Sequence, residues 1–258
     1  MKLMTKKLTA FTLAETLIVM GIIGIVATLT IPSLTNSTNS KDTVAKVKKA
    51  HANLEDAFGR MIGSYGELDE WTDTLTSNLV ANRLFGSMKL TKNCGTTTPN
   101  GSCFKSGSNY YDANAANNTT NFYQVVQADG ISTGIQIFST NCTSNAGTDV
   151  TQDLKEICGT ISIDVDGPSK GKNKQGQDVF TFYLTKKGIY PVGTQNDTKF
   201  KSDDECLKKG YDATQDAKGC TAWVVYNGNM DYKKAGTDAK CKTGSGKTLN
   251  WTGNVSCD

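Results

Sequence analysis

The fold is decided by the stretch AFTLAETLIVMGIIGIVATLTIPSL at residues 10–34. After Glu15 the chain carries no charged side chain until Lys41, so residues 16–40 form an uncharged run of 25 residues. A helix of that length measures about 37 Å, which exceeds the roughly 30 Å hydrocarbon core of a bilayer. Residues 1–10, MKLMTKKLTA, are short and basic. The pattern predicts a membrane-spanning helix over residues 11–40.

Two other kinds of N-terminal segment begin in a similar way. A secretory signal peptide has a basic segment, a short apolar run, and then a small residue at the cleavage site. Here the apolar run is too long, and the small residue Ala10 precedes the run instead of following it. The second kind is a signal anchor, a membrane-spanning segment that is not cleaved and would therefore keep residues 1–10. Both alternatives stay open at this point.

Glu15 interrupts the apolar pattern. A carboxylate inside a membrane helix costs roughly 2.5–3.5 kcal/mol on insertion scales, so it needs a positive partner or a proton. No Lys or Arg lies within one helical turn on its C-terminal side. Cleavage between Ala10 and Phe11 would create an α-amino group next to this carboxylate. The Phe11 amine could then pair with Glu15 of the same chain or of a neighbouring chain.

The residues Ala10-Phe11-Thr12-Leu13-Ala14-Glu15, followed by an apolar run, resemble the prepilin processing site of type IV pilins and type II secretion pseudopilins. The resemblance implies that a membrane peptidase cuts between Ala10 and Phe11 and that Phe11 is N-methylated. It implies that Glu15 and the Phe11 amine register subunits in a filament, and that Pro32 kinks the helix. Ala10 departs from the family, which usually has Gly there.

The same resemblance implies a cellular location and a set of partners. The chain would cross a bacterial inner membrane once, with its C-terminal head outside the cytoplasm, and then enter a periplasmic pseudopilus or a cell-surface pilus. Its partners would be the prepilin peptidase and methyltransferase, other pilin or pseudopilin subunits, the inner-membrane assembly platform and membrane lipid. Three segments follow: a leader over 1–10, an apolar helix over 11–40 and an exported head over 41–258.

The head begins with an amphipathic helix. Val44, Val47, Leu54, Phe58 and Met61 recur at helical spacing, and charged residues occupy the other side. This helix should end near residues 63–66, and the spacing of Trp71, Leu75, Leu79 and Leu84 predicts a second helix over residues 69–86.

Further along, the periodicity changes to that of strands. Segments 122–128 and 131–140 flank Asp129-Gly130, a strong hairpin signal. Segments 159–166, 178–185, 189–191 and 222–226 also read as strands, whereas 91–121 and 193–220 look like loops. The sequence predicts an α+β, pilin-like fold. A long N-terminal membrane-spanning helix packs by its C-terminal half on an antiparallel sheet of three to five strands, in a disulfide-rich head.

The eight cysteines all follow the apolar segment, and no two are spaced as CxxC. This argues against zinc ribbons, iron–sulfur clusters and thioredoxin-like sites. An even number of cysteines predicts four disulfides in an oxidising compartment. Eight cysteines allow 105 pairings, and pairing neighbours in sequence is the simplest choice. Those pairs are Cys94–Cys103, Cys142–Cys158, Cys206–Cys220 and Cys241–Cys257.

One loop between predicted strands carries candidate metal ligands. Asp164, Asp166, Asn173 and Asp178 offer oxygens to a hard cation such as calcium. The loop resembles a D-x-N-G…P-N-x-x-G-x-D-x-F pattern of pseudopilin-like proteins, with Lys172 in place of the proline, and some pseudopilins bind calcium in such a loop. The three lysines of this loop and the absence of EF-hand ligand order favour a plain glycine-rich connection instead.

Composition and charge exclude several functions. The formal charge of +3 comes from 28 basic and 25 acidic residues, and Lys2, Lys6 and Lys7 lie in the leader, so the cleaved chain is neutral. Nucleic acid is therefore an unlikely partner. The only histidine is His51, and no serine-hydrolase, zinc-protease or phosphate-loop motif occurs. The sequence predicts a structural filament subunit and no enzyme. The alternative is a membrane-anchored adhesin or binding module, as a minor or tip pilin.

Overall fold

The computed structural model describes residues 13–97, 101–105, 122–200, 203–208, 217–242 and 246–257. Within these ranges the side chains of residues 29, 31–37, 203, 204, 208 and 237 are not described. Ala10 and Phe11, the predicted cleavage site, lie outside the described residues, and so does the side chain of Pro32. The chain divides into two compact units, residues 1–42 and 43–258.

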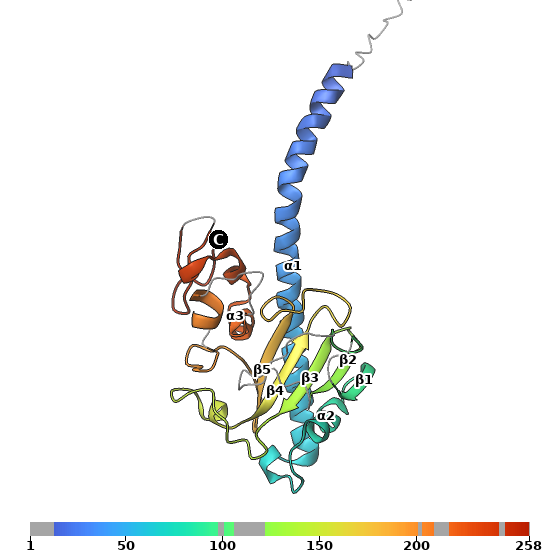
Figure 1. Ribbon diagram of the computed structural model, residues 1–258, viewed down its shortest axis with the longest axis vertical. Helices are drawn as coiled ribbons and strands as arrows, with labels where there is room; N and C mark the ends of the chain where they lie inside the picture. The colour runs from blue at the N-terminus through green and yellow to red at the C-terminus, as the bar shows by residue number, and fades with distance from the viewer. Residues whose placement is uncertain are drawn as a thin grey trace, which may run out of the picture. The chain divides into compact units, whose positions relative to one another are not determined.

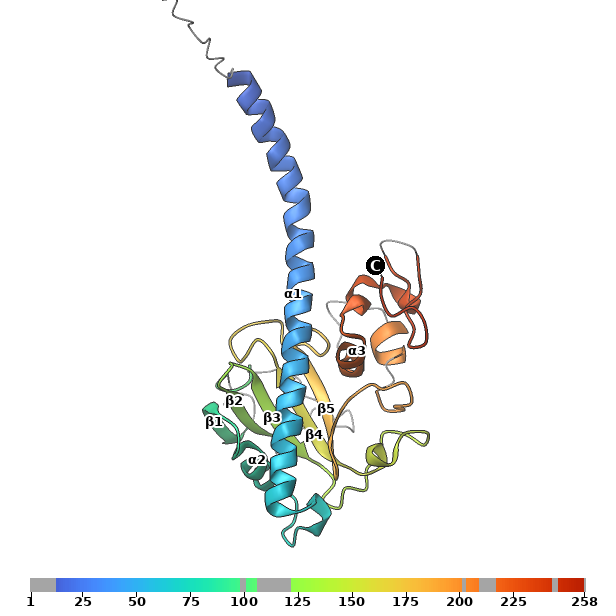
Figure 2. The ribbon, with the colours of Figure 1, turned by 180° about the vertical axis from the view of Figure 1, so that it is seen from behind.

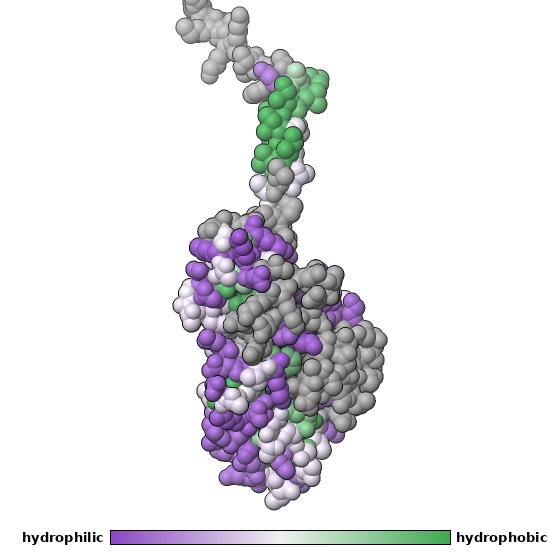
Figure 3. All heavy atoms as spheres, turned by 60° about the vertical axis from the view of Figure 1, so that its left-hand side comes forward, coloured by the Kyte–Doolittle hydropathy of each residue, from purple (hydrophilic) through white to green (hydrophobic). Residues whose placement is uncertain are grey.

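The helix α1 covers Leu13–Tyr65 and so belongs to both units. In the first unit its side chains are exposed on all sides from Leu13 to Val26. On the face drawn in Figure 3, most of this part of the helix is hydrophobic. The hydroxyl groups of Thr16 and Thr28 are hydrogen-bonded within the helix. They donate to the carbonyls of Leu13 and Ile25 at 2.9 and 2.8 Å.

No helix within the described part of the chain meets the length and hydropathy that crossing a membrane requires.

The second unit is built on a six-stranded antiparallel sheet in the order β1-β2-β3-β4-β5-β6, so every strand pairs with its neighbour in sequence (Figure 1). The strands are β1 (Leu90–Thr96), β2 (Tyr123–Gln127), β3 (Ser132–Ile137), β4 (Ile157–Asp164), β5 (Val179–Thr185) and β6 (Ile189–Pro191). The hairpin signal at Asp129-Gly130 is confirmed, since β2 and β3 pair across it.

The second half of α1 covers one face of this sheet, as Figure 2 shows. Its apolar stripe, including Val47, Leu54 and Met61, is fully or almost fully buried. The stripe shares one core with alternate residues of β4 and β5 such as Ile161 and Phe182. Apolar and polar residues alternate along β4 and β5 because only one face of each strand packs against the helix. The predicted α+β class and the amphipathic second half of the helix are confirmed.

Three predictions of local structure were wrong. Residues 222–226 were predicted as a strand but belong to helix α3 (Cys220–Asn227). Five consecutive apolar residues fit a buried helix as well as a strand, and this helix ends at Gly228, whose φ of +67° is left-handed. The predicted helix over 69–86 shortens to α2 (Ser77–Phe85), which begins where the Thr76 hydroxyl accepts the Leu79 N–H at 3.2 Å.

The third error concerns β1, which lies in a region predicted to be a loop. β1 is an edge strand with two register irregularities, and all seven of its residues are exposed or half-buried. A strand that is polar on both faces shows no alternation of apolar and polar residues. The sheet therefore has six strands, instead of the three to five predicted.

All eight cysteines form disulfides, which confirms the predicted oxidised head. Each bond joins cysteines that are neighbours in sequence order: 94–103, 142–158, 206–220 and 241–257. Cys142–Cys158 ties the segment after β3 to the beginning of β4, and Cys206–Cys220 anchors α3.

Candidate functional site

The apolar surface of the first unit is the feature that most needs a functional explanation. Leu13 is 80% exposed and Met20 is 74% exposed, and seven further large apolar side chains up to Val26 are more than half exposed. A folded protein does not normally leave so much contiguous apolar surface in water. Glu15 lies within this surface and is also exposed. The segment is therefore suited to contact lipid or other apolar helices.

The β4–β5 loop brings three of the four predicted metal ligands together. A Cβ atom on Gly171 would contact carboxylate oxygens of both Asp166 and Asp178, so these two side chains border the same glycine. Asp164 is completely buried, and one of its oxygens, Oδ1, accepts the Asp166 N–H at 3.1 Å. Burial, and next the negative charges of Asp178 and Asp166, raise the pKa of Asp164 to about 8.

The carboxylate of Asp178 organises this loop. It accepts the backbone N–H groups of Lys172, Asn173 and Lys174, the last two at 2.7 Å. By contrast, Asp164 Oδ2 and Asn173 Oδ1 are buried and have no hydrogen-bond partner among the described residues. Within the described chain no three acidic, histidine or cysteine side chains form a ready metal-binding group. The predicted ligands therefore share a loop, and two of them offer unused oxygens.

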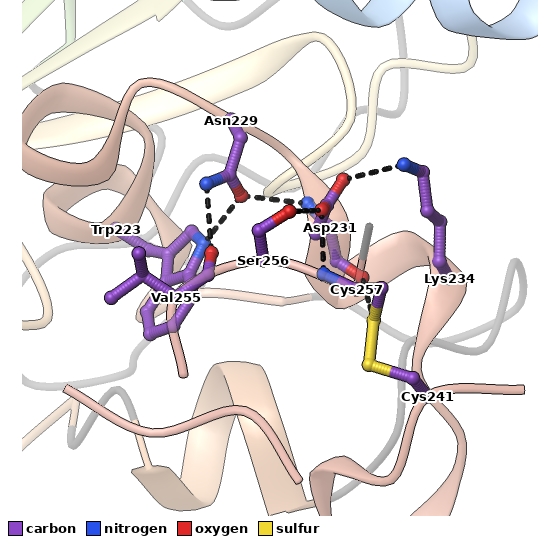
Figure 4. Close-up of a disulfide and its surroundings, with 8 residues drawn as sticks. All are labelled: Trp223, Asn229, Asp231, Lys234, Cys241, Val255, Ser256 and Cys257. Atoms are coloured by element: carbon purple, nitrogen blue, oxygen red, sulfur yellow. Dashed lines mark hydrogen bonds and ion pairs between the residues drawn. A yellow bond between two sulfur atoms is a disulfide. The ribbon is translucent and has the colours of Figure 1, made fainter. Parts of the chain in front are cut away.

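Sequence reasoning did not foresee a polar clasp that fastens the C-terminal segment (Figure 4). Asp231 Oδ2 accepts the Ser256 hydroxyl at 2.8 Å and the Cys257 N–H at 2.9 Å, and Oδ1 pairs with Lys234 at 3.0 Å. Asn229 donates to the Val255 carbonyl at 2.8 Å. The disulfide Cys241–Cys257 closes the same region. The hydrogen bonds to Ser256, Cys257 and Val255 join residues 25 or 26 positions apart, and no local sequence pattern predicts them.

Asp231 should make stability depend on pH. Burial favours its neutral form, but the hydrogen bonds from Cys257, Lys234 and Ser256 outweigh burial and hold the pKa of Asp231 below its ordinary value. A lowered folded-state pKa adds stability above about pH 4, and that stability is lost as the pH falls through the folded-state pKa. We expect Asp231→Asn to lower the free energy of unfolding by about 2–4 kcal/mol at pH 7.

Urea unfolding at pH 7 and at pH 3 checks this expectation. The difference in the free energy of unfolding between wild type and Asp231→Asn should be smaller at pH 3 than at pH 7. Asp238→Asn is the matched control, because it makes the same chemical change at an exposed position. If this difference were equal at both pH values, the negative charge of Asp231 would not be the source of the stability.

His51 and an open cavity beside α1 are two further candidate sites. His51 stacks on Phe182 with ring centroids 5.0 Å apart, and its Nε2 lies 2.9 Å from the Ile189 carbonyl oxygen. An open cavity of about 290 Å³ lies between α1 and the β2–β3 turn. Its charged side chains include the ion pair of Lys49 with Asp129 at 3.1 Å.

Comparisons with protein-family models, with curated proteins and with solved structures return no match.

Proposed function

We propose that this chain is a structural subunit of a prepilin-type filament, either a type II secretion pseudopilus or a type IV pilus. One observation carries the proposal: the apolar surface around Glu15 lies on a helix whose other half is the core helix of a disulfide-rich head. The same helix would lie in a bacterial inner membrane before assembly and in the filament core afterwards.

Assembly then follows from simple physical chemistry. The prepilin peptidase exposes the Phe11 amine, and the carboxylate of Glu15 attracts that amine on a neighbouring subunit. The assembly platform lifts subunits out of the bilayer. Extraction is feasible because each apolar helix exchanges lipid contacts for contacts with identical helices, so that little apolar surface meets water. The resemblance of the 164–180 loop to pseudopilin-like proteins favours the secretion branch and export into the periplasm.

Filament isolation tests the proposal. Cells producing the chain together with a prepilin peptidase and an assembly platform should release filaments containing it on mechanical shearing. Electron microscopy with antibodies against the head should label those filaments along their length. A chain found only as dispersed membrane monomers under these conditions would contradict the proposal.

The head also suits the alternative function of an adhesin or tip subunit. The C-terminal clasp and two disulfides give an ordered, loop-rich surface beyond the sheet, and loops held on a rigid scaffold are common recognition sites. Antibody labelling distinguishes the two functions, because a tip subunit would be labelled at filament ends only. Binding of the filaments to host-cell glycans would then identify the ligand class.

We further propose that a calcium ion completes the β4–β5 loop. The unused oxygens of Asp164 and Asn173 support this, since calcium is bound by oxygen ligands. Burial is the main cause of the raised pKa of Asp164, and the negative charges of Asp178 and Asp166 add to it. A cation in this loop would offset the repulsion among these carboxylates. Lys170, Lys172 and Lys174 oppose binding, so we expect a dissociation constant of about 1 mM, the weak end of the range for extracellular proteins.

Thermal unfolding with and without calcium checks this prediction. At 5 mM calcium a site of that affinity adds about 1 kcal/mol, which raises Tm by about 2–4 °C in a domain of this size. Asp164→Asn should abolish the rise, whereas Asp149→Asn, an exposed matched control, should keep it. Calorimetry that detects no heat of binding at 5 mM would exclude the site.

A further inference from the structure

The charge along α1 and the segment after it changes sign within the second unit. Residues 43–49 of α1 carry three lysines and no acid, whereas residues 50–76 carry six acids and one arginine. Residues 48 and 65 are separated by about 25 Å along the helix. The basic end is defined by lysines of α1 and of the β4–β5 loop: Lys46, Lys48, Lys49, Lys170, Lys172 and Lys174. The acidic end is defined by Glu67, Asp69, Glu70 and Asp73.

Contacts within the unit bring the two sets of lysines to one place. Lys46 lies 3.7 Å from Asp166 of the β4–β5 loop, and Lys49 lies 3.1 Å from Asp129 of the β2–β3 turn. The two turns also touch each other, because a Cβ on Gly167 would lie 2.7 Å from the Gly130 carbonyl oxygen. The loop and the first turns of α1 in this unit therefore share one end of the sheet.

In three of the four ion pairs considered at the two ends, the more exposed member has the sign of its end. At the acidic end Asp73 is 62% exposed and its partner Arg83 only 21%, while Asp69 is 43% exposed and its partner Lys186 only 19%. At the basic end the order reverses, since Lys49 is 60% exposed and Asp129 only 25%. Lys46 and Asp166 are equally exposed, at 39% and 38%. The exposed member has the sign of its end in three of the four pairs.

We propose that the basic end of one copy docks on the acidic end of a second copy, so that neighbouring heads meet head to tail. The inference rests on the proposed filament function and names a contact that the heads would make in it. A contact between different patches on identical chains does not close on itself in pairs, so it propagates into a ring or a helical filament. Exposed charges of this kind set orientation and register more than they set affinity.

Zero-length cross-linking of the full-length chain in sheared filaments tests the contact. A carbodiimide couples a carboxylate directly to a lysine amine, and the two ends of one head lie too far apart to be joined. In filaments made from mixed light- and heavy-isotope chains, we expect peptides that link Lys170 or Lys172 of one copy to Asp69 or Asp73 of another. Filaments that give no such link would overturn the proposal and leave the proposed function standing.

Charge reversal gives a second, independent readout. Lys170→Glu with Lys172→Glu places two acidic side chains on the basic end, and Asp69→Lys with Asp73→Lys places two lysines on the acidic end. Each double variant alone should lower the filament yield by about tenfold, because like charges meet. The two variants mixed should recover most of the yield, which two misfolded chains would not do. No recovery on mixing would contradict the head-to-tail contact.

The matched control places the same change of net charge at the opposite end. The control variant is Lys155→Glu with Lys187→Glu. Both residues lie at the acidic end, because they are next in sequence to Glu156 and Lys186. Lys186 pairs with Asp69, and the Lys186 N–H donates to the Glu156 carbonyl at 3.2 Å. This control should keep the wild-type yield.

Vesicles containing phosphatidylglycerol test a rival partner. If Lys170→Glu with Lys172→Glu abolishes vesicle binding and leaves filament yield unchanged, the basic end faces lipid and the proposal is wrong. A wild-type chain that forms neither filaments nor end-to-end links would contradict both proposals.

Discussion

Replacing Glu15 with valine should leave cleavage by the prepilin peptidase largely intact and reduce incorporation into filaments by at least about tenfold. The carboxylate would pair with the Phe11 amine of a neighbouring subunit in the apolar filament core. Leaving one member of a buried ion pair without its partner costs about 3–5 kcal/mol, more than enough for a tenfold loss. The measurement is the ratio of chain in sheared filaments to chain in the membrane.

Thr16→Val is the matched control for this experiment. Thr16 is the next residue on the same helix, and its hydroxyl donates to the Leu13 carbonyl of its own helix. Its loss changes polarity without changing charge, so filament yield should stay close to wild type. A Glu15→Val chain that assembles as well as Thr16→Val would remove the ion pair from the mechanism.

Removing the disulfide Cys142–Cys158, by replacing both cysteines with alanine, should lower the free energy of unfolding by about 3 kcal/mol. Both cysteines are almost fully buried, and the bond closes a loop with a sequence separation of 16. The estimate follows from the chain entropy that a cross-link of this size removes from the unfolded state. For a domain of this size the expected fall in Tm is about 6–12 °C.

Thermal unfolding of the two-alanine variant measures this effect, and mass analysis of the non-reduced wild type accompanies it. The wild type should show no free thiol. Ser139→Ala serves as a control in the same segment, because it keeps the disulfide and removes only the hydroxyl that accepts the Thr143 N–H at 3.0 Å. A variant that unfolds within 2 °C of the control would show that this disulfide contributes little to stability.

Local signals in the sequence gave reliable predictions where one physical cause dominated. Strands β4 and β5 were predicted because one face of each packs on α1, which imposes alternation. The β2–β3 hairpin was predicted because Gly130 adopts a positive φ of 85° that few other residues tolerate. Neighbouring cysteines pair because each closes a short loop.

Other features depend on contacts that no local pattern records. The edge strand β1 has no apolar face, and α3 is too short for its period to be read. The clasp joins Asp231 to Ser256 and Cys257, which follow it by 25 and 26 positions in the chain. The division of charge was visible in residues 43–76, but only the folded chain places Lys170 and Lys172 at the same end as Lys49.

If this chain is a processed prepilin-type subunit, its first residue after processing is Phe11, and the mass of the N-terminal peptide shows whether it is. The protein should be purified from its native membrane and digested without chemical labelling of amines. We expect a first peptide that begins at N-methylated Phe11, with residues 1–10 absent. A first peptide beginning at Met1 or Lys2 would contradict it, because the chain would then be an uncleaved signal anchor without the amine that Glu15 requires.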